Sequence, residues 1–323
     1  MKKQISSNDA IEFFRTSIQQ SEIIVYDEDT FSNICKSVLS LNAVAIKSHS
    51  SQVFLLTNSD GDKYVLKIRT IDTKRKLQKI RLECHATSLL KNASVRAGQP
   101  IFYSTHEEYE LCVFEFIEGK LLSEVRLDLN TIESVWKSIH MTQKIFGSVP
   151  ANDLFSQIQT KTNSVERLSR QIYARFKIDI SDELDDLFSI ETTEESSVVV
   201  SDRSPANWIS DNGNLFAIDF DLVFFGDRYL DFCFFNEDYR LKTKCSRSDL
   251  LSEFEKYMTD NHSGFSIDSY LTLSIYHCLL QSTFLQTRQS IETTLDSGAQ
   301  NSNMLGFSNL AKVAQKLKAR TEI

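Results

Sequence analysis

One segment, residues 198–231, constrains the fold more than any other part of this 323-residue chain. It reads VVVSDRSPANWISDNGNLFAIDFDLVFFGDRYLD, with acidic and amide side chains between short runs of Val, Ile, Leu and Phe. These polar residues are Asp202, Asn207, Asp219, Asp221, Asp227 and Asp231. Carboxylates beside apolar strands lose hydration on folding unless a cation or hydrogen-bond donors stabilise them. The segment is therefore predicted to form a functional site.

The middle of this segment predicts a β-hairpin. Strands at 207–209 and 215–220 flank Asp-Asn-Gly at 211–213, a sequence typical of tight turns. Such a hairpin would bring Asn207 and Asp219 to the same end of its two strands. An amide oxygen and a carboxylate suit Mg²⁺, a hard cation that prefers oxygen ligands. The catalytic candidate is the nearby carboxylate that precedes them on the loop, Asp202, which could accept a proton.

Before this segment, the spacing of apolar residues predicts two helices and then a sheet. The first helix is expected to begin with a capping box formed by Asp9 and Glu12. The second helix is expected at 30–41, and three strands rich in Val, Ile, Leu and Phe are expected at 41–47, 51–58 and 63–68. Asn-Ser-Asp-Gly-Asp at 58–62 predicts a hairpin turn between the last two strands.

The loop between the first two strands is small and polar, and it contains Ser50 and Ser51. Its backbone N–H groups and hydroxyls could close over phosphates. Small polar residues are equally typical of any hairpin loop, so both interpretations stay open.

Lys67 stands in the apolar third strand, where a buried lysine needs an anionic partner. The helix expected at 73–91 offers Glu83, which neighbours the apolar Ile80 and Leu90 and is expected to point inward. A bound anionic ligand is the other candidate partner. Because a strand lysine can also lie at an exposed edge, the pair becomes persuasive only together with the aspartate-rich segment.

Two more strands are expected at 101–105 and 109–117. The second strand runs into Gly119, and this stretch is expected to connect two lobes. The backbone groups of Glu115 and Ile117 could there pair with a purine edge. The rest of the chain is mostly helical by the spacing of its apolar residues, with helices expected at 132–146, 154–176, 246–259, 267–294 and 304–320.

The motifs together resemble the aminoglycoside phosphotransferase and choline kinase family. Its catalytic segment runs His-Gly-Asp, four residues, Asn, a strand ending Ile-Asp-Trp/Phe-Asp, then Gly-Asp and a further Asp. The matching residues here are Val200-Ser201-Asp202, Asn207, Ile218-Asp219-Phe220-Asp221, Gly226-Asp227 and Asp231. The strand lysine and helix glutamate of the family match Lys67 and Glu83. Five matching elements in the same order are a more specific signal than a single motif.

This resemblance implies an α+β, two-lobed protein-kinase-like fold. A small N-lobe at residues 1–117, with an antiparallel sheet and one key helix, would bind nucleotide, and its first part, 1–40, would be a helical lead-in. A larger, mainly helical C-lobe at 118–323 would carry catalysis and substrate binding.

The resemblance also implies a chemistry, the transfer of a phosphoryl group from ATP or GTP to a hydroxyl of a small molecule. Asp202 would orient or deprotonate that hydroxyl, while Asn207 and Asp219 would hold Mg²⁺ on the nucleotide phosphates. Lys67 would contact these phosphates, and Glu83 would position Lys67. The other residues expected to bind nucleotide are Ser50, Ser51, Glu115 and Ile117. Asp227 and Asp231 would brace the catalytic loop through backbone hydrogen bonds.

Two departures from the family pattern leave an alternative open. Val200-Ser201 stands where His-Gly is expected, and Arg203 follows the catalytic aspartate where an apolar residue is common. Arg203 could touch a phosphate or an anionic substrate, or it could form a salt bridge with a nearby aspartate. These departures motivate the alternative of a pseudokinase or nucleotide-binding regulatory protein without transfer activity.

Composition limits the remaining possibilities. The net charge of −8 and pI near 5.4 argue against a general nucleic-acid binder. No apolar run approaches the length of a membrane helix, and the six cysteines include no CxxC pair. We therefore expect a reduced cytoplasmic protein with no membrane contact. An acidic protein suits a cationic acceptor such as an aminoglycoside or a choline-like amine, and the oligomeric state stays open.

Overall fold

The computed structural model describes most of the chain, with short gaps. The described residues are 5–19, 23–46, 52–71, 78–91, 93, 95–106, 108–149, 165–180, 184, 196–200, 202–220, 223–243, 247–262, 264–285, 288–305 and 308–319. Four residues singled out in the sequence lie outside them: Ser50, Ser51, Ser201 and Asp221. The first part of the helix expected at 154–176 lies outside them too.

The chain forms two compact units, each built from several segments. Unit 1 consists of Met1–Leu121, Lys144–Gln157 and Trp208–Val223. Unit 2 consists of Leu122–Gln143, Ile158–Asn207 and Phe224–Ile323. The predicted hairpin of the aspartate-rich segment therefore belongs to unit 1, whereas the residues that directly precede it belong to unit 2.

The main sheet of unit 1 has six strands, and all its neighbouring pairs are antiparallel. In spatial order the strands are β1 (Ile23–Val25), β6 (Pro100–His106), β7 (Tyr109–Glu115), β4 (Lys63–Thr70), β3 (Gln52–Thr57) and β2 (Asn42–Ile46). Alternate residues of β4 are buried, as period-two side-chain placement requires. The five predicted strands are confirmed, and β1 is too short to have shown a pattern of its own.

The turn between β3 and β4 depends on Asn58. Its side-chain oxygen accepts hydrogen bonds from the backbone N–H groups of Asp60 at 3.0 Å and Asp62 at 2.8 Å. Gly61 adopts a φ of +90°, which favours glycine. The predicted hairpin turn is confirmed.

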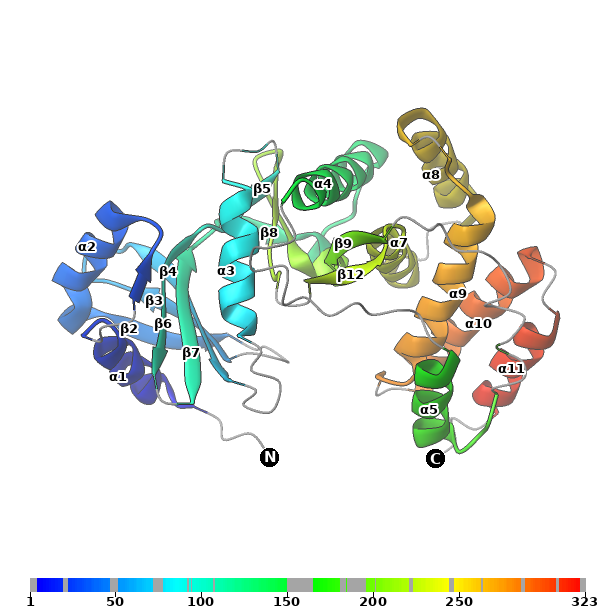
Figure 1. Cartoon of the computed structure of the whole chain (residues 1–323), viewed down its shortest axis with the longest axis horizontal. Coiled ribbons are helices and arrows are strands. Elements are labelled where there is room, and N and C mark those ends of the chain that lie inside the picture. Colours follow the sequence, from blue (N-terminus) through cyan, green and yellow to red (C-terminus); the bar gives the residue numbers. More distant parts are fainter. Residues whose placement is uncertain are drawn as a thin grey trace. The chain divides into compact units, whose positions relative to one another are not determined.

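Helices cover both faces of the main sheet (Figure 1). They are α1 (Ser7–Ser17), α2 (Glu28–Ser37), which a short 3₁₀ turn η1 (Val38–Ser40) follows, and α3 (Lys79–Leu89). Phe14 of α1 and Ile34 of α2 are fully buried in a core with Leu66 of β4. Cys84 of α3 packs on the opposite face, where Val65 of β4 lies.

The start of α1 differs from the prediction. The N-cap is Ser6, whose hydroxyl accepts a hydrogen bond from the Asp9 backbone N–H at 3.1 Å, and Asp9 is the residue that closes the capping box. Glu12 instead forms an ion pair with Arg15 at 2.7 Å. The prediction of Asp9 and Glu12 was wrong because both pairs have the same spacing, and the helix begins one turn earlier.

A second sheet of unit 1 contains the predicted hairpin. Its strands, in spatial order, are β5 (Arg96–Ala97), β11 (Asn214–Ala217), β10 (Trp208–Asp211) and β8 (Lys120–Leu121). Asn212 and Gly213 both have positive φ, at 48° and 81°, as a two-residue hairpin turn requires. Gly119 has a φ of +135°, and a Cβ there would lie 2.5 Å from the Ser210 carbonyl oxygen. Only glycine permits this close approach of β8 to β10.

Unit 2 is mainly helical. Its helices are α4 (Leu129–Gly147, whose last residues belong to unit 1), α5 (Val165–Phe176), α7 (Leu230–Thr243), α8 (Arg247–Asn261), α9 (Ile267–Ser282), α10 (Arg288–Met304) and α11 (Ser308–Lys318). It also contains a two-stranded sheet of β9 (Ser196–Val200) and β12 (Val223–Asp227, whose first residue belongs to unit 1), and the 3₁₀ turns η2 (Leu122–Glu124) and η4 (Pro205–Asn207).

The single helix expected at 267–294 is wrong, because α9 ends at Ser282 and α10 starts at Arg288. The hydroxyl of Thr283 donates to the Leu280 carbonyl at 2.7 Å, and this contact closes the last turn of α9. The chain then returns so that α10 packs along α9. A Cβ on Gly298 of α10 would lie 3.3 Å from the Cys278 Cβ, so the two helices approach closely.

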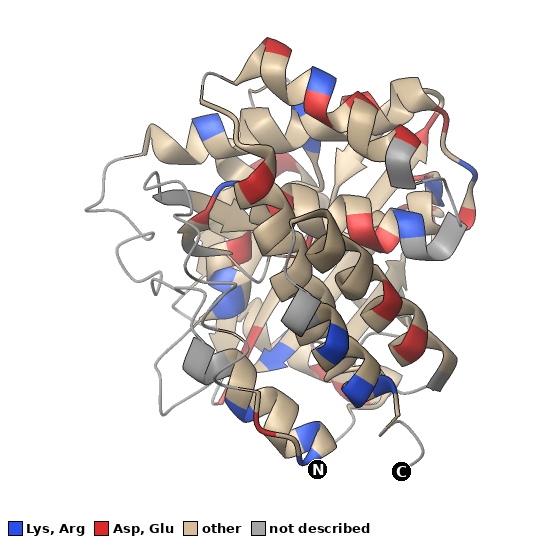
Figure 2. Cartoon of the chain, turned by 90° about the vertical axis from the view of Figure 1, so that its right-hand side faces the viewer, with Lys and Arg blue, Asp and Glu red and all other residues tan. Residues whose placement is uncertain are grey.

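The surface charge is mixed along the helices. In Figure 2, acidic and basic residues both occur along several of the helices. Among the described helices, none is both long and apolar enough to cross a bilayer.

Candidate functional site

Lys67, Glu83 and Asp219 meet in unit 1. Lys67 lies on β4, and its Nζ is 2.6 Å from Glu83 Oε1 and 3.0 Å from Asp219 Oδ1. Glu83 comes from α3, and Asp219 follows the hairpin strand β11. The side chains of Lys67 and Glu83 are only 13% and 4% exposed, whereas that of Asp219 is 32% exposed. The group is therefore buried on the helix side and reachable on the side of Asp219.

The neighbouring carboxylates keep Lys67 positively charged. Burial alone would lower the pKa of its ammonium group, but the carboxylates of Glu83 and Asp219 raise the pKa more, so the net shift is upward. Lys67 also lies over the ring of Phe114, 5.7 Å from its centre. The ammonium group stays protonated, which makes it a fixed positive charge for an anionic ligand.

Asp219 adopts a backbone conformation that few residues accept. Its φ is +61°, and aspartate is one of the non-glycine types that tolerate this region. Such a conformation persists where surrounding contacts hold it. Here Lys67 binds the Asp219 side chain, and the backbone N–H of Phe220 donates to Glu83 Oε1 at 3.3 Å. The outlier marks Asp219 as a functional residue candidate.

Asp202 and Asn207 lie together on a loop of unit 2. The side-chain N–H of Asn207 donates to the backbone carbonyl of Asp202 at 2.6 Å, and its backbone N–H donates to the Ser204 carbonyl at 2.9 Å. Pro205 opens the 3₁₀ turn η4 that places Asn207. Because the amide nitrogen is used in this contact, the amide oxygen is the atom that could bind a cation.

A buried aspartate of α7, Asp231, supports the strand before this loop. Asp231 Oδ2 accepts hydrogen bonds from the backbone N–H of Val200 at 3.2 Å and from Gln143 Nε2 at 2.9 Å. Burial raises the pKa of Asp231 to about 7, although Gln143, the charge of Arg203 and Val200 act in the opposite direction. Asp227 instead accepts from the Tyr229 backbone N–H at 2.9 Å, within its own turn. Asp231 thus accepts a backbone hydrogen bond as predicted, from the end of the strand that leads into the loop.

The structure shows the surroundings of Val200 and Arg203, two residues that depart from the family pattern. Val200 is buried, and its contact with Asp231 uses the backbone, so this support does not depend on a histidine side chain. Arg203 is 2% exposed, and its charge acts on Asp231. Of the two interpretations of Arg203, the interaction with a nearby aspartate is the one that its burial favours.

The remaining predicted residues lie at the end of β7. Glu115 is exposed and pairs with Tyr64 of β4, and its backbone N–H donates to the Gln99 carbonyl at 2.9 Å. Ile117 follows two residues later, and its side chain would lie 3.3 Å from a Cβ on Gly98. The Glu115 N–H is thus committed to Gln99.

Sequence reasoning missed Gln143, which also donates to the Arg228 carbonyl at 2.7 Å. Its signal was a polar residue on the apolar side of the helix expected at 132–146. Sequence reasoning also missed Glu237, whose signal was the group Asn-Glu-Asp within the apolar run of α7.

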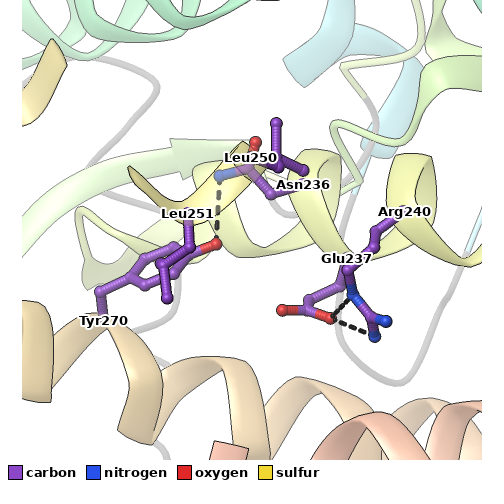
Figure 3. A pocket seen from close by; sticks show the side chains of 6 residues that line it. All are labelled: Asn236, Glu237, Arg240, Leu250, Leu251 and Tyr270. Carbon is purple, nitrogen blue, oxygen red and sulfur yellow. Dashed lines mark hydrogen bonds and ion pairs between the residues drawn. The ribbon is translucent and has the colours of Figure 1, made fainter. Parts of the chain in front are cut away.

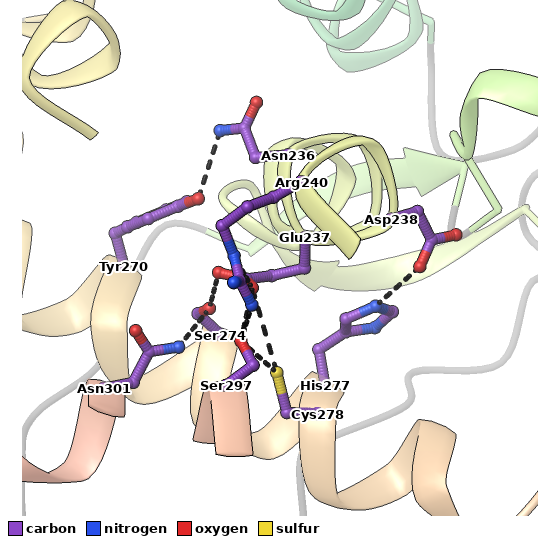
Figure 4. A network of polar contacts seen from close by, with 10 residues as sticks. All are labelled: Asn236, Glu237, Asp238, Arg240, Tyr270, Ser274, His277, Cys278, Ser297 and Asn301. Atoms are coloured by element: carbon purple, nitrogen blue, oxygen red, sulfur yellow. Dashed lines mark hydrogen bonds and ion pairs between the residues drawn. The ribbon is translucent and has the colours of Figure 1, made fainter. Parts of the chain in front are cut away.

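Glu237 is the centre of a buried network in unit 2 (Figure 4). Its carboxylate binds Arg240 at 2.9 Å on α7, Ser297 at 2.9 Å on α10 and Ser274 on α9. Asn301 Nδ2 donates to the Ser274 hydroxyl at 2.8 Å. The network ties three helices together, and Arg240 balances the carboxylate.

A pocket of about 260 Å³ adjoins the network, a volume that includes adjoining solvent (Figure 3). It is lined by Asn236, Glu237, Arg240, Leu250, Leu251 and Tyr270. The side-chain oxygen of Asn236 accepts a hydrogen bond from the Trp136 indole N–H at 2.8 Å. The side-chain nitrogen of Asn236 donates to the Tyr270 hydroxyl at 3.1 Å. Since its polar groups already bind one another, the pocket is best explained by the packing of α7 and α9.

The sequence also matches a known protein family. The model of the phosphotransferase enzyme family matches residues 42–240, which are more than half of the chain. The matched range includes Lys67, Glu83 and Asp219 of unit 1 as well as Asp202 and Asn207 of unit 2. The chain belongs to this phosphotransferase family. The comparison with curated protein sequences gave no match.

Solved structures show the same fold. Amicoumacin kinase hAmiN, in complex with AMP-PNP, Ca²⁺ and Ami, has a TM-score of 0.61 at 14% identity, covering 86% of this chain and 94% of that chain. Spectinomycin phosphotransferase APH(9)-Ia, in complex with ADP and spectinomycin, has a TM-score of 0.61 at 12% identity, covering 99% of both chains. Choline kinase from Cryptosporidium parvum Iowa II has a TM-score of 0.56 at 14% identity, covering 90% and 99%.

These likenesses confirm the predicted fold class. The protein is α+β and protein-kinase-like, with an antiparallel sheet in its N-terminal region and a helical C-terminal region. Identities this low establish the fold, and function must be argued from the site.

Proposed function

We propose that the chain is a small-molecule kinase that transfers the γ-phosphoryl group of ATP or GTP to a hydroxyl group. The observation that carries this proposal is Lys67 held between Glu83 and Asp219, at 2.6 Å and 3.0 Å. Phosphoryl transfer depends mainly on alignment and on neutralising phosphate charge. A buried, oriented ammonium group beside a partly exposed carboxylate supplies both.

In this mechanism Lys67 neutralises phosphate charge. An ammonium group has three N–H donors, and two are directed at Glu83 and Asp219. The third would donate to the α and β phosphates, while Glu83 keeps the side chain oriented. We further propose that the loop with Ser50 and Ser51 contributes phosphate contacts.

Asn207 and Asp219 would hold Mg²⁺. Their residue types fit, because Mg²⁺ takes oxygen ligands and is commonly held by one or two protein groups plus phosphates and waters. When bound, the ion would neutralise charge on the phosphate oxygens. Asp202 would orient the acceptor hydroxyl and accept its proton.

We propose the following division of labour along the chain. Residues 1–117 would bind the nucleotide, with the Glu115 carbonyl and Ile117 N–H facing the base. Residues 118–323 would provide catalysis and acceptor binding. A cytoplasmic location is proposed from the five described cysteines, which are all free thiols.

Replacement of Asp202 tests the proposal. Asp202→Asn should lower kcat by about 10²- to 10⁴-fold, because the amide cannot accept the hydroxyl proton. The matched control is Asp211→Asn, a half-buried aspartate beside the turn of the hairpin that follows in the chain, which should leave kcat unchanged. The measurement is nucleotide consumption with Mg²⁺. Unchanged turnover in Asp202→Asn would contradict the assignment of Asp202 as the catalytic residue.

The acceptor is best identified by a panel of amino-sugars, sugars, amino alcohols and nucleosides. The net charge of −8 supports a cationic acceptor, such as an aminoglycoside or a choline-like amine. A cationic acceptor should therefore stimulate nucleotide consumption more than its neutral analogue does.

The alternative function is a nucleotide-binding pseudokinase, favoured by the missing histidine at Val200. A rise in Tm with ATP and Mg²⁺, combined with no transfer to any acceptor, would support this alternative. The backbone hydrogen bond between Val200 and Asp231 supports the active kinase, because it does not require the missing histidine.

A further inference from the structure

Two cysteine thiols lie almost in bonding contact beside the Lys67 ion pair. The Sγ atoms of Cys84 on α3 and Cys112 on β7 are 3.0 Å apart, and both side chains are fully buried. Both residues belong to unit 1 and pack in one cluster with Ile80 and Phe114. A disulfide has an S–S length near 2.05 Å, so closing the bond requires a movement of about 1 Å.

These cysteines are direct neighbours of the charged groups. Cys84 follows Glu83 in the chain, and Cys112 is the cross-strand partner of Lys67 in the pairing of β7 with β4. A bond between the two sulfurs would therefore link the helix that carries Glu83 to the strand beside Lys67. The Lys67–Glu83 distance of 2.6 Å leaves little tolerance for such a shift.

We propose that Cys84 and Cys112 form a reversible intramolecular disulfide when a peroxide oxidises the protein, and that this bond displaces Glu83 from Lys67. The reaction uses one hydrogen peroxide for two thiols. The thiolate of one cysteine attacks one peroxide oxygen, the O–O bond breaks, and the departing hydroxide combines with the proton that this thiol lost, giving water. The other cysteine then attacks the sulfur of the sulfenic acid, and the second oxygen leaves as water with the proton of that second thiol.

The environment determines how fast the thiols react. Burial raises the pKa of both thiols. Because the two sulfur atoms are 3.0 Å apart, either thiol can react first and the other can then attack it. Because the thiolate is the reactive form, oxidation should be slow near pH 7 and faster at higher pH. Peroxide is small enough to enter when α3 opens locally from the sheet.

The link is read directly by mass spectrometry of the full chain. The protein is treated with hydrogen peroxide while folded, its remaining thiols are alkylated after unfolding, and it is digested with and without reductant. We expect a cross-linked peptide pair containing Cys84 and Cys112 that reductant separates. Recovery of these residues only as alkylated or over-oxidised cysteines overturns the disulfide.

Variants assign the effect to this pair. Cys112→Ala should abolish the cross-link, and Cys84→Ala provides the same test if the first variant folds poorly. The control is Cys35→Ala, a half-buried thiol of α2 in the same unit, which should retain the cross-link. Loss of the link in Cys35→Ala as well would overturn the assignment.

The effect on activity rests on the proposed kinase function, whereas the cross-link does not. Oxidation should lower the phosphotransfer rate by about 10- to 100-fold, since a misplacement of about 1 Å among groups that orient the substrate has effects of this size. Reductant should restore the rate, and Cys112→Ala should be insensitive to peroxide. A cross-linked protein with an unchanged transfer rate would overturn the displacement of Glu83. A protein without transfer activity would leave the cross-link result standing.

Discussion

At the scale of single residues, the Lys67 ion pair is predicted to stabilise unit 1 as well as to serve catalysis. Lys67→Met removes the charge while keeping much of the side-chain length. It leaves the Glu83 carboxylate, 4% exposed, without its main counter-charge. Breaking a buried pair in this way costs about 3 to 5 kcal/mol. Urea unfolding should show this loss of unfolding free energy.

A double-mutant cycle separates the pair from general packing. Lys67→Met combined with Glu83→Gln removes both charges, so the double variant should be more stable than the sum of the two single losses predicts. Simple additivity would contradict a direct interaction between the two side chains.

Asp231 is predicted to make unit 2 more stable at acid than at neutral pH. Burial raises its pKa to about 7, against opposing effects of Gln143, Arg203 and Val200. In the unfolded chain the pKa of an aspartate is about 4. Between these values the folded state alone binds the proton, so the unfolding free energy falls as pH rises from about 4 to about 7.

The measurement is urea unfolding of the wild type and Asp231→Asn at pH 5 and pH 8. Asparagine cannot ionise, so the variant should lose less stability between the two pH values than the wild type. An equal pH dependence of both proteins would show that Asp231 does not titrate in this range.

At the scale of helices and strands, Glu237 is predicted to hold α7, α9 and α10 together. Its side chain is 5% exposed and contacts Arg240, Ser274 and Ser297 from these helices. Glu237→Ala leaves Arg240 buried without its partner, which should lower the unfolding free energy by about 3 to 5 kcal/mol. The control is Glu255→Ala on the exposed side of α8, which should change stability little. Chemical denaturation followed by circular dichroism measures both.

The same helices show how far the sequence alone predicts the fold. Periodicity located α8 and α11 within a few residues, because one face of each is apolar. It failed at the end of α9, which is buried on nearly every side. A uniformly apolar helix has no periodic signal at its boundary, so the return of α10 along α9 was not visible.

At the scale of the whole molecule, nucleotide and Mg²⁺ are predicted to stabilise the protein together. A ligand that binds only the folded state raises Tm, and the stabilisation grows with the logarithm of the ligand concentration divided by Kd. ATP with Mg²⁺ should raise Tm more than ATP with a chelator, and the chelator should abolish transfer. Asn207→Ala should remove most of the Mg²⁺-dependent part of the shift. The control Asn130→Ala, an exposed residue of α4, should retain it.

The sequence by itself indicated the family, the antiparallel strands and the turns, and it offered Glu83 as one of two candidate partners of Lys67. These follow from local spacing and from turn residues, whose preferences act over a few positions. Only the tertiary structure decided that Asp219, 152 residues further on, binds Lys67, and that Gln143 and Val200 hold Asp231. Periodicity tells which face of an element is buried. The packing of elements distant in sequence decides which side chains meet on that face.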